Sequence, residues 1–278
     1  MKETTNFGLK KPEANDFYDF ETQNENLDEI DRVLQEYKEG TQPVGDSAKL
    51  GGKALNDIVQ QDSKSVYVSP SGSDENGDGT QENPWRTIQK AVNECPAIAD
   101  NNSMYIIYLA DGVYTENLDV RRKVFRLQSI DTANADITLK GNMYVRHGSY
   151  VEIRTPMTID TENTQYHALN STDGGRLSIL SPITVKNATS CGLVASGQSS
   201  IFANAKVTVD GCRYAISAET ASIVACGVCE IKNSTEGLCT KGGILAYHSV
   251  SFENVTTQYV TSYGGRMYTG AQTSVGKY

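Results

Sequence analysis

The stretch ITVKN at residues 183–187 decides the fold, because related phrases return along the chain at nearly constant intervals. The phrases start 20, 26, 24, 22 and 21 residues apart and read ITL (137–139), MTI (157–159), ITV (183–185), VTV (207–209), CEI (229–231) and VSF (250–252). Two more sets of short apolar segments keep this interval, with Asn, Gly and Ser between them. Three strand-length segments per repeat predict an all-β fold, a parallel β-helix of about seven coils with three strands per coil.

The fourth residue of each phrase forms what we call the charge row. Side chains alternate in a strand, so Ile183 and Val185 are expected to point inward, whereas Thr184 and Lys186 point outward. The sign of the charge alternates through the six members, which are Lys140, Asp160, Lys186, Asp210, Lys232 and Glu253. Stacked coils would place these side chains about 4.8 Å apart, with cations beside anions. We interpret the row as structural.

A catalytic role for the charge row is the alternative interpretation. Glycosidase chemistry uses two facing carboxyl groups, one of which has a raised pKa. Lysine neighbours instead favour the ionised form of a carboxyl group. We therefore expect no catalytic residue, although enzymatic activity stays open, and we expect no cofactor.

The overall charge restricts the class of partner. The 278 residues include 25 Lys and Arg against 34 Asp and Glu, a net charge of −9. Binding to nucleic acid requires a basic surface, so no nucleic-acid partner is expected. No apolar run approaches the ~18 residues of a membrane-spanning helix, and the first residues lack the apolar core of a secretory signal. Membrane insertion is therefore not expected.

Two short motifs carry the spacing of metal sites. Residues 74–79, DENGDG, have the D-x-N-x-D-G spacing of a calcium loop, but the twelfth position is Trp85 instead of a bidentate Glu. Cys226 and Cys229 form a CxxC pattern, which suits a redox pair or half of a zinc site. No second CxxC follows, so we expect six buried, reduced cysteines, a plain turn at 74–79 and no metal.

Exposed aromatic residues near the end of the chain are the best candidates for binding a partner. Tyrosine rings combine a large apolar surface with a hydroxyl group, which suits contact with a glycan or a protein. The candidate residues are Tyr247, Tyr263 and Tyr268. Tyr214 and Tyr259 occupy matching positions in the second set of segments, so a role in the core competes with a role at the surface.

Two amphipathic helices are expected before the repeats. Asn26 and Glu29 favour the start of the first helix and Gly40 its end. Its apolar seam has spacings of 3, 4 and 3 and consists of Leu27, Ile30, Leu34 and Tyr37. Two heptads do not make an independent coiled coil, so the seam needs partners, and a homotrimer or a larger surface of the same chain would supply them.

The second helix is expected to cap the β-helix. Asn83 suits its N-cap and Pro84 its first position. Its apolar face consists of Trp85, Ile88, Val92 and Cys95. The expected organisation is an attachment segment (1–40) with a short trimerising helix, a linker (41–64), a leading strand and capping helix (65–103), and the β-helix (104–278).

Three segments resemble known families. Residues 46–58, DSAKLGGKALNDI, resemble the linker near the start of many bacteriophage tail fibre proteins. Residues 6–31 are similar to the opening of tail fibre and baseplate-attached proteins of phages and phage-tail-like bacteriocins. Residues 66–96 look like the leading segment of pectate-lyase-like β-helix proteins.

The resemblance implies a homotrimeric tail fibre with a right-handed β-helix, located in a virion or phage-tail-like particle. The N-terminus would attach to a baseplate or tail protein, and the β-helix would recognise a glycan or protein on the host cell. A polysaccharide depolymerase is the alternative, because some relatives degrade cell-surface glycans. A structural spacer without a ligand is a third, weaker interpretation.

Overall fold

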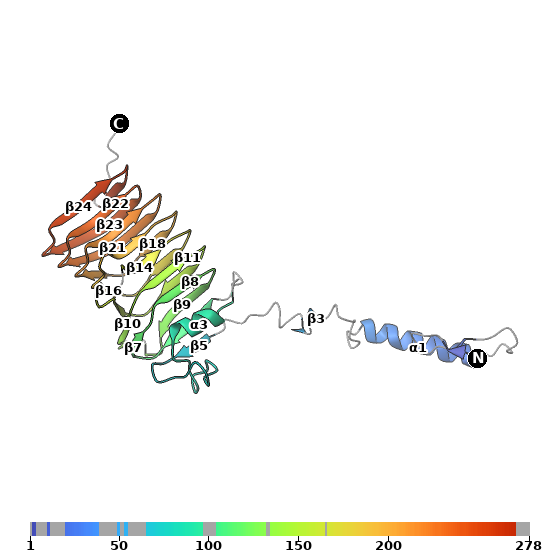
Figure 1. The fold of residues 1–278 in the computed structure, drawn as a ribbon. Coiled ribbons are helices and arrows are strands. Elements are labelled where there is room, and N and C mark those ends of the chain that lie inside the picture. Colours follow the sequence, from blue (N-terminus) through green and yellow to red (C-terminus); the bar gives the residue numbers. More distant parts are fainter. Residues whose placement is uncertain are drawn as a thin grey trace. The chain divides into compact units, whose positions relative to one another are not determined.

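The computed structural model describes residues 65–270, except 97–103, 132–133 and 165, together with 2–3, 10–11, 20–38, 49–50 and 53–54. The chain forms two compact units, residues 1–61 and 62–278. The second unit is a parallel β-helix of about seven coils, as the repeat predicts. Its strands stack as successive rungs, coloured from green near β8 to red near β24 (Figure 1).

The first unit contains helix α1 (Phe20–Lys38) and two short antiparallel strand pairs, β1 (Lys2–Glu3) with β2 (Lys10–Lys11) and β3 (Lys49–Leu50) with β4 (Lys53–Ala54). The helix begins six residues before the predicted start at Asn26. Glu and Gln are good helix formers and acidic residues suit the first turn, so residues 20–25 extend the helix past that cap.

The β-helix has three faces, and the strands within each face are parallel. The first face contains β5 (Ser65–Val68), β6 (Tyr105–Leu109), β9 (Val124–Ser129), β12 (Tyr150–Ile153), β15 (Arg176–Ile179), β18 (Ser200–Ala203), the first halves of β21 (Ile223–Lys232) and β23 (Ile244–Glu253), and β25 (Arg266–Thr269). The second face contains β7 (Gly112–Thr115), β10 (Ile137–Lys140), β13 (Met157–Asp160), β16 (Ile183–Lys186), β19 (Val207–Asp210) and the second halves of β21 and β23. The third face contains β8 (Leu118–Arg121), β11 (Met143–Arg146), β14 (His167–Ser171), β17 (Cys191–Ala195), β20 (Tyr214–Glu219), β22 (Glu236–Lys241) and β24 (Thr257–Ser262).

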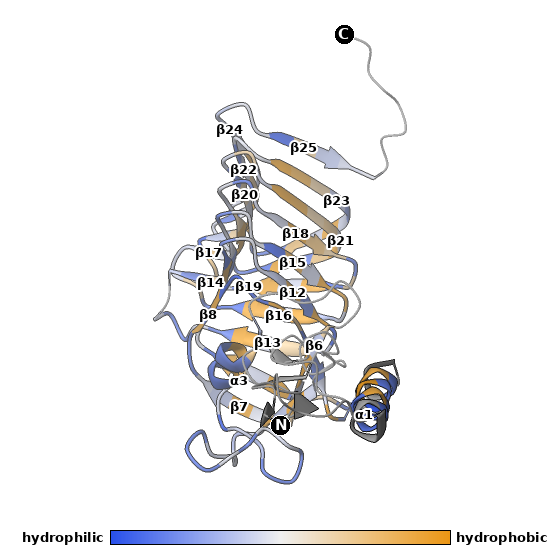
Figure 2. Ribbon diagram, turned by 90° about the vertical axis from the view of Figure 1, so that its right-hand side faces the viewer, coloured by the Kyte–Doolittle hydropathy of each residue, from blue (hydrophilic) through white to orange (hydrophobic). Residues whose placement is uncertain are grey.

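The core is a column of side chains that stack in rows along the β-helix axis. One row on the third face is buried in six successive coils, with at most 1% exposure, and contains Leu118, Met143, Leu169, Leu193, Ile216 and Leu238. Hydrophobic residues accordingly concentrate in strands such as β16, and hydrophilic residues in the turns (Figure 2). Since a single coil cannot enclose its apolar residues, stacking of coils supplies the core.

The corners between faces depend on left-handed backbone conformations. After the second face the turn residue is Asn187, Gly211, Asn233 or Asn254, with φ of 62°, 69°, 46° and 53°. Asn and Gly tolerate this region better than other residues. The Asn and Gly residues that end the repeated phrases therefore turn the chain.

The last coils pass one corner without a turn, because β21 and β23 each run for ten residues across two faces. Cys226 and Cys229 lie on either side of this corner and form a disulfide. The expectation of six reduced thiols is therefore wrong for Cys226 and Cys229. The path of the chain around this corner brings their two sulfur atoms together. The other four, Cys95, Cys191, Cys212 and Cys239, are free and buried.

Helix α3 (Ile88–Glu94) covers the N-terminal end of the column. Its apolar face is buried as predicted, since Trp85, Ile88, Val92 and Cys95 are at most 6% exposed. The N-cap, however, is Thr87, whose Oγ1 accepts a hydrogen bond from Lys90 N at 3.2 Å. Asn83 instead donates its side-chain amide to Asn76 O at 2.9 Å, so it serves the turn before the helix.

Candidate functional site

The charge row lies on the outer surface of the second face. Its members are paired in register from coil to coil, Lys140 with Asp160, then Lys186, Asp210, Lys232 and Glu253. Ion pairs join Lys186 to Asp160 at 3.1 Å and Lys232 to Glu253 at 3.5 Å. Neighbouring coils thus place opposite charges side by side.

Some members of the charge row bind other partners. Lys140 forms its ion pair with Glu162 in the following turn, at 2.5 Å. Asp210 accepts a hydrogen bond from Asn233 Nδ2 at 2.7 Å. Side chains of the corner therefore take part in the row, which the alignment of strand residues alone does not reveal.

The environment of Asp160 favours its ionised form. Burial alone would raise the pKa of its carboxyl group, but hydrogen bonds from Asn187 Nδ2 (2.8 Å) and Glu162 N (2.9 Å), together with Lys186, lower it overall. Glu230, outside the row on β21, also has a lowered pKa because Lys206 and Lys232 bind it at 2.7 and 3.3 Å. These carboxylates are poor general acids at neutral pH.

A raised pKa occurs at Glu116, where burial is the main cause. Its two carboxyl oxygens accept hydrogen bonds from Ile88 N and Gln89 N, both at 2.8 Å. The first amides of α3 have no partner within the helix, and a carboxylate there satisfies them. Glu116 therefore fastens the capping helix, with each carboxyl oxygen accepting from one amide of α3.

The D-x-N-x-D-G segment is a turn. Asp74 accepts hydrogen bonds from Arg86 N, Thr87 N and Thr87 Oγ1 at 2.9, 3.0 and 2.7 Å. Asp78 binds Thr80 at 2.8 Å. Across the described residues, no group of three or more His, Cys, Asp and Glu side chains is arranged to hold a metal ion.

The C-terminal end of the β-helix differs from every coil before it. Each face contributes one aromatic residue to its inward rows there. Phe252 follows Val209 and Ile231, and Tyr259 follows Ile216 and Leu238, and these two rows end in the aromatic residue. Tyr247 follows Ala203 and Cys226 and is itself followed by Thr269 of β25. Tyr259 is 47% exposed, although Leu238 directly below it is fully buried. We call Tyr247, Phe252 and Tyr259 the aromatic end.

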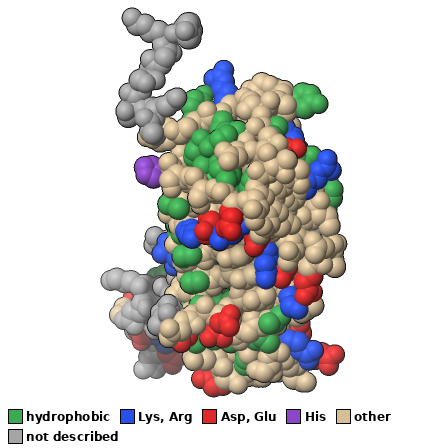
Figure 3. Space-filling model, turned by 90° about the vertical axis from the view of Figure 1, so that its left-hand side faces the viewer, with side chains coloured by type: hydrophobic (Ala, Val, Ile, Leu, Met, Phe, Trp, Pro, Cys, Tyr) green, Lys and Arg blue, Asp and Glu red, His purple; other side chains and the backbone are tan. Residues whose placement is uncertain are grey.

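The three rings of the aromatic end contact one another. Tyr247 stacks on Tyr259 with 6.1 Å between ring centroids, and Phe252 meets Tyr259 edge to face at 5.3 Å. Burial and the hydrogen bond with Tyr259 raise the pKa of Tyr247 to about 12. Hydrophobic side chains gather on the upper part of the surface seen in Figure 3, toward the C-terminal end. Among the described residues, no element covers this end as α3 covers the other.

The predicted binding tyrosines fall into two environments. Tyr263 and Tyr268 are outward residues of the last coil, 89% and 47% exposed. Tyr247 points inward but is only half-buried. Tyr247 and Tyr268 line a shallow hollow of about 360 Å³, which Cys226, His248 and Gly270 also border. The structure therefore places all three in the last two coils, and their role in binding stays a prediction.

Two residues of this end were missed by sequence reasoning. Phe252 fits the apolar position of its phrase and gave no sign of exposure, and Met267 belongs to the strand that closes the last coil. Their local pattern gives no signal, because Phe252 and Met267 occupy the same inward positions as Ile231 and Leu245 one coil earlier.

The seam of α1 is exposed in the single chain. Leu27, Ile30 and Leu34 are 62%, 41% and 61% exposed. The side chain of Tyr37, the fourth predicted member, lies outside the described residues. An exposed apolar stripe on a helix is typical of a surface that associates with a partner.

Within the part of the chain that the structure describes, no helix has the length and apolar composition needed to cross a membrane. Comparisons with protein-family models, curated proteins and solved structures find no match to this chain.

Proposed function

We propose that the chain is a tail-fibre-type protein of a phage or phage-like particle, and that it recognises a glycan or protein on a bacterial surface. The observation that carries this proposal is the aromatic end, where Tyr247, Phe252 and Tyr259 converge from three faces. Tyrosine rings supply a rigid apolar surface with a polar tip and lose little entropy on binding. Sugar rings and protein side chains both pack on such surfaces.

The position of these rings supports the proposal. The N-terminal end of the column is closed by α3, whereas the described residues leave the aromatic end partly exposed and accessible to a partner. Tyr263 and Tyr268 extend the aromatic surface beyond the column. Exposed apolar patches of this kind mark binding sites in soluble proteins.

The α1 seam supports assembly into a homotrimer. Leu27, Ile30 and Leu34 repeat at the spacing of a and d positions, which pack against partner helices in coiled coils. Association of three chains would bury the seam and place three aromatic ends in one particle. Several weak contacts with a repetitive cell surface would then reinforce one another.

Binding to whole cells tests the proposed function. Full-length protein is labelled and incubated with a panel of bacteria, before and after removal of surface carbohydrate. Tyr259→Ser should reduce binding to the strains that the unaltered protein binds. Tyr166→Ser is the matched control, because Tyr166 is 64% exposed but lies in the middle of the column. Equal binding by Tyr259→Ser and the unaltered protein would reject a role for the aromatic end.

Light scattering tests the assembly. The full chain should have the mass of three chains, and Leu27→Glu combined with Leu34→Glu should give single chains. A full chain that is monomeric under native conditions would refute the trimer without affecting the aromatic end.

A further inference from the structure

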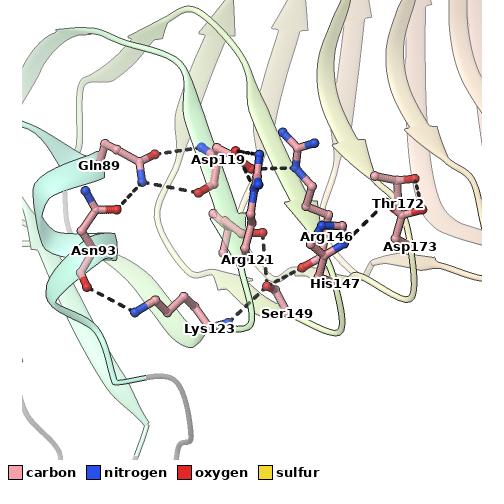
Figure 4. Close-up of polar contacts among 11 residues, drawn as sticks. Gln89, Asn93, Asp119, Arg121, Lys123, Arg146, His147, Ser149, Thr172 and Asp173 are labelled. Carbon is pink, nitrogen blue, oxygen red and sulfur yellow. Dashed lines mark hydrogen bonds and ion pairs between the residues drawn. The ribbon is translucent and has the colours of Figure 1, made fainter.

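A group of basic side chains gathers at one corner of this acidic protein. Sequence segments 121–123, Arg-Arg-Lys, and 146–147, Arg-His, lie about a repeat apart in the chain. Stacking of β8 and β11 pairs Arg121 directly with Arg146. We call Arg121, Arg122, Lys123, Arg146 and His147 the basic corner, which lies between the third and first faces near α3 (Figure 4).

The basic corner is held in place by a small number of contacts. Asp119 lies between Arg121 and Arg146 and binds both, at 2.6 Å each. Its main chain is fixed by α3, since Gln89 Oε1 accepts a hydrogen bond from Asp119 N at 2.8 Å. Arg146 also lies over the ring of Tyr144, 5.3 Å from the centroid. Both guanidinium groups are thus oriented before any ligand arrives.

The cations at this corner exceed the nearby carboxylates. Four permanent cations, Arg121, Arg122, Lys123 and Arg146, lie beside two carboxylates, those of Asp119 and Asp173, and Lys123 Nζ already donates to Asn93 O at 3.2 Å. His147 lies 3.6 Å from Asp173, which is the second acid of the corner. A guanidinium group has five N–H donors. Asp119 accepts from only some of the donors of Arg121 and of Arg146.

Arg122 is the member of the basic corner that the fold does not need. It is exposed and adopts φ of 54°, a conformation that favours Gly, Asn or Asp. The corresponding position one coil later is His147, and the next is Asp173, with φ of 56° and 50°. A long cationic side chain at a strained corner suggests a role in binding.

We propose that the basic corner binds an acidic polysaccharide of the bacterial surface, through oxyanion groups held by Arg121, Arg122 and Arg146. Arginine pairs with carboxylate, sulfate and phosphate through two parallel hydrogen bonds, and it does so better than lysine. The net charge of −9 repels polyanions from the rest of the surface, so binding would be restricted to this corner. This inference rests on the proposed function and adds a second contact, on the flank of the β-helix.

Binding of purified polymers to the full-length protein tests the inference independently of any cell. The probes are polygalacturonate and dextran sulfate, with neutral dextran and double-stranded DNA as comparison polymers. The unaltered protein should bind at least one acidic polysaccharide, not neutral dextran, and binding should weaken as salt rises, because exposed charges are screened. Arg122→Glu should weaken binding about tenfold, the scale of one charged hydrogen bond.

Matched variants separate binding from folding. Arg122→Lys should retain most of the affinity, whereas Arg122→Gly should lose it with a Tm at or above that of the unaltered protein, since Gly accepts the left-handed corner. Arg213→Glu makes the same charge change at an exposed residue just before β20, four coils along the third face, and should bind normally.

Three results would overturn the basic corner as a polysaccharide site. They are absence of binding to both acidic polysaccharides, an equal loss in Arg213→Glu, and DNA binding as tight as polysaccharide binding at the same salt concentration. Tyr259→Ser should leave polymer binding intact. Failure of the aromatic end and failure of the basic corner are therefore distinguished, because each has its own variant and its own assay.

Discussion

The two ends of the β-helix differ in how far the core side chains of their outermost coils are covered. At the N-terminal end, the turn and the helix that precede β6 bury their own side chains Trp85, Ile88 and Val92 in the core of the column. At the C-terminal end, the described chain leaves Tyr247 and Phe252 half-buried and Tyr259 47% exposed. A repeat protein needs its terminal coils covered or made polar. Among the described residues, the core side chains of the N-terminal end are therefore covered, whereas those of the C-terminal end are partly exposed.

The largest effect is expected at the covered end. Trp85→Ala removes a ring that is 6% exposed and whose Nε1 donates to Gly77 O at 3.1 Å. Loss of a buried aromatic should reduce the free energy of unfolding by about 3–5 kcal/mol. Urea denaturation followed by circular dichroism measures it. A loss as small as that of an exposed residue would mean that α3 does not hold this end closed.

The attachment of the capping helix should depend on pH through Asp74. Burial would raise the pKa of Asp74, but the hydrogen bonds from Thr87 and Arg86 lower it overall. A lowered pKa in the folded state contributes stability that is present above the unfolded pKa and lost as pH falls through the folded pKa. Asp74→Asn should therefore cost about 1–2 kcal/mol at pH 7.

The cost of Asp74→Asn should shrink as pH falls below about 4, the ordinary value for Asp in an unfolded chain, and should vanish below the lower pKa of folded Asp74, where its carboxyl group is protonated in both states. Thermal unfolding of Asp74→Asn and of the unaltered protein, at pH 7 and at low pH, measures this change. A difference between the two proteins that stays constant with pH would contradict ionic capping. Asp131→Asn, in a turn away from α3, is the control for the loss of one carboxylate.

A smaller effect is expected at the aromatic end. Tyr259→Ala removes the contacts with Tyr247 and Phe252 but less buried surface than Trp85→Ala, because Tyr259 is 47% exposed and Trp85 is 6% exposed. An aromatic pair contributes about 0.5–1.5 kcal/mol beyond area burial, so the loss should lie near that range. Urea denaturation of Tyr259→Ala and Trp85→Ala under the same conditions compares their losses in the free energy of unfolding. Equal losses at the two ends would show that the C-terminal end is as closed as the N-terminal one.

The smallest effect is expected between the ends, in the charge row. Lys186→Glu replaces the ion pair with Asp160 by repulsion and places three acids, at 160, 186 and 210, in adjacent coils. Exposed pairs contribute about 0.2–1 kcal/mol, and salt should reduce the loss. Unfolding at low and high salt concentration measures it. Lys186→Gln is the control that removes the cation without adding repulsion.

The sequence predicts the column well because each strand repeats the same local pattern. Ile183 and Val185 are buried in their phrase, and the interval between phrases sets the register of Lys186 with Asp160. A period of two and a constant repeat length are local properties, which a single sequence reveals.

Contacts made at corners and ends escaped prediction because they depend on segments distant in sequence. Asn83–Pro84 is a good local start for a helix, but hydrogen bonds from Arg86 and Thr87 to Asp74 set the start at Thr87. Lys140 turns to Glu162 because the corner carries that carboxylate within reach. Tyr259 is exposed although Leu238, at the same position one coil earlier, is buried, and its own phrase does not encode this difference.

The alternating charge row has a consequence for how the molecule can change length. Its sign repeats every second coil, so duplication or loss of two coils leaves the alternation intact. Removing the single coil that carries Lys186 would instead bring Asp160 beside Asp210. We therefore expect the insertion or removal of two coils to disturb the charge row less than the insertion or removal of one coil.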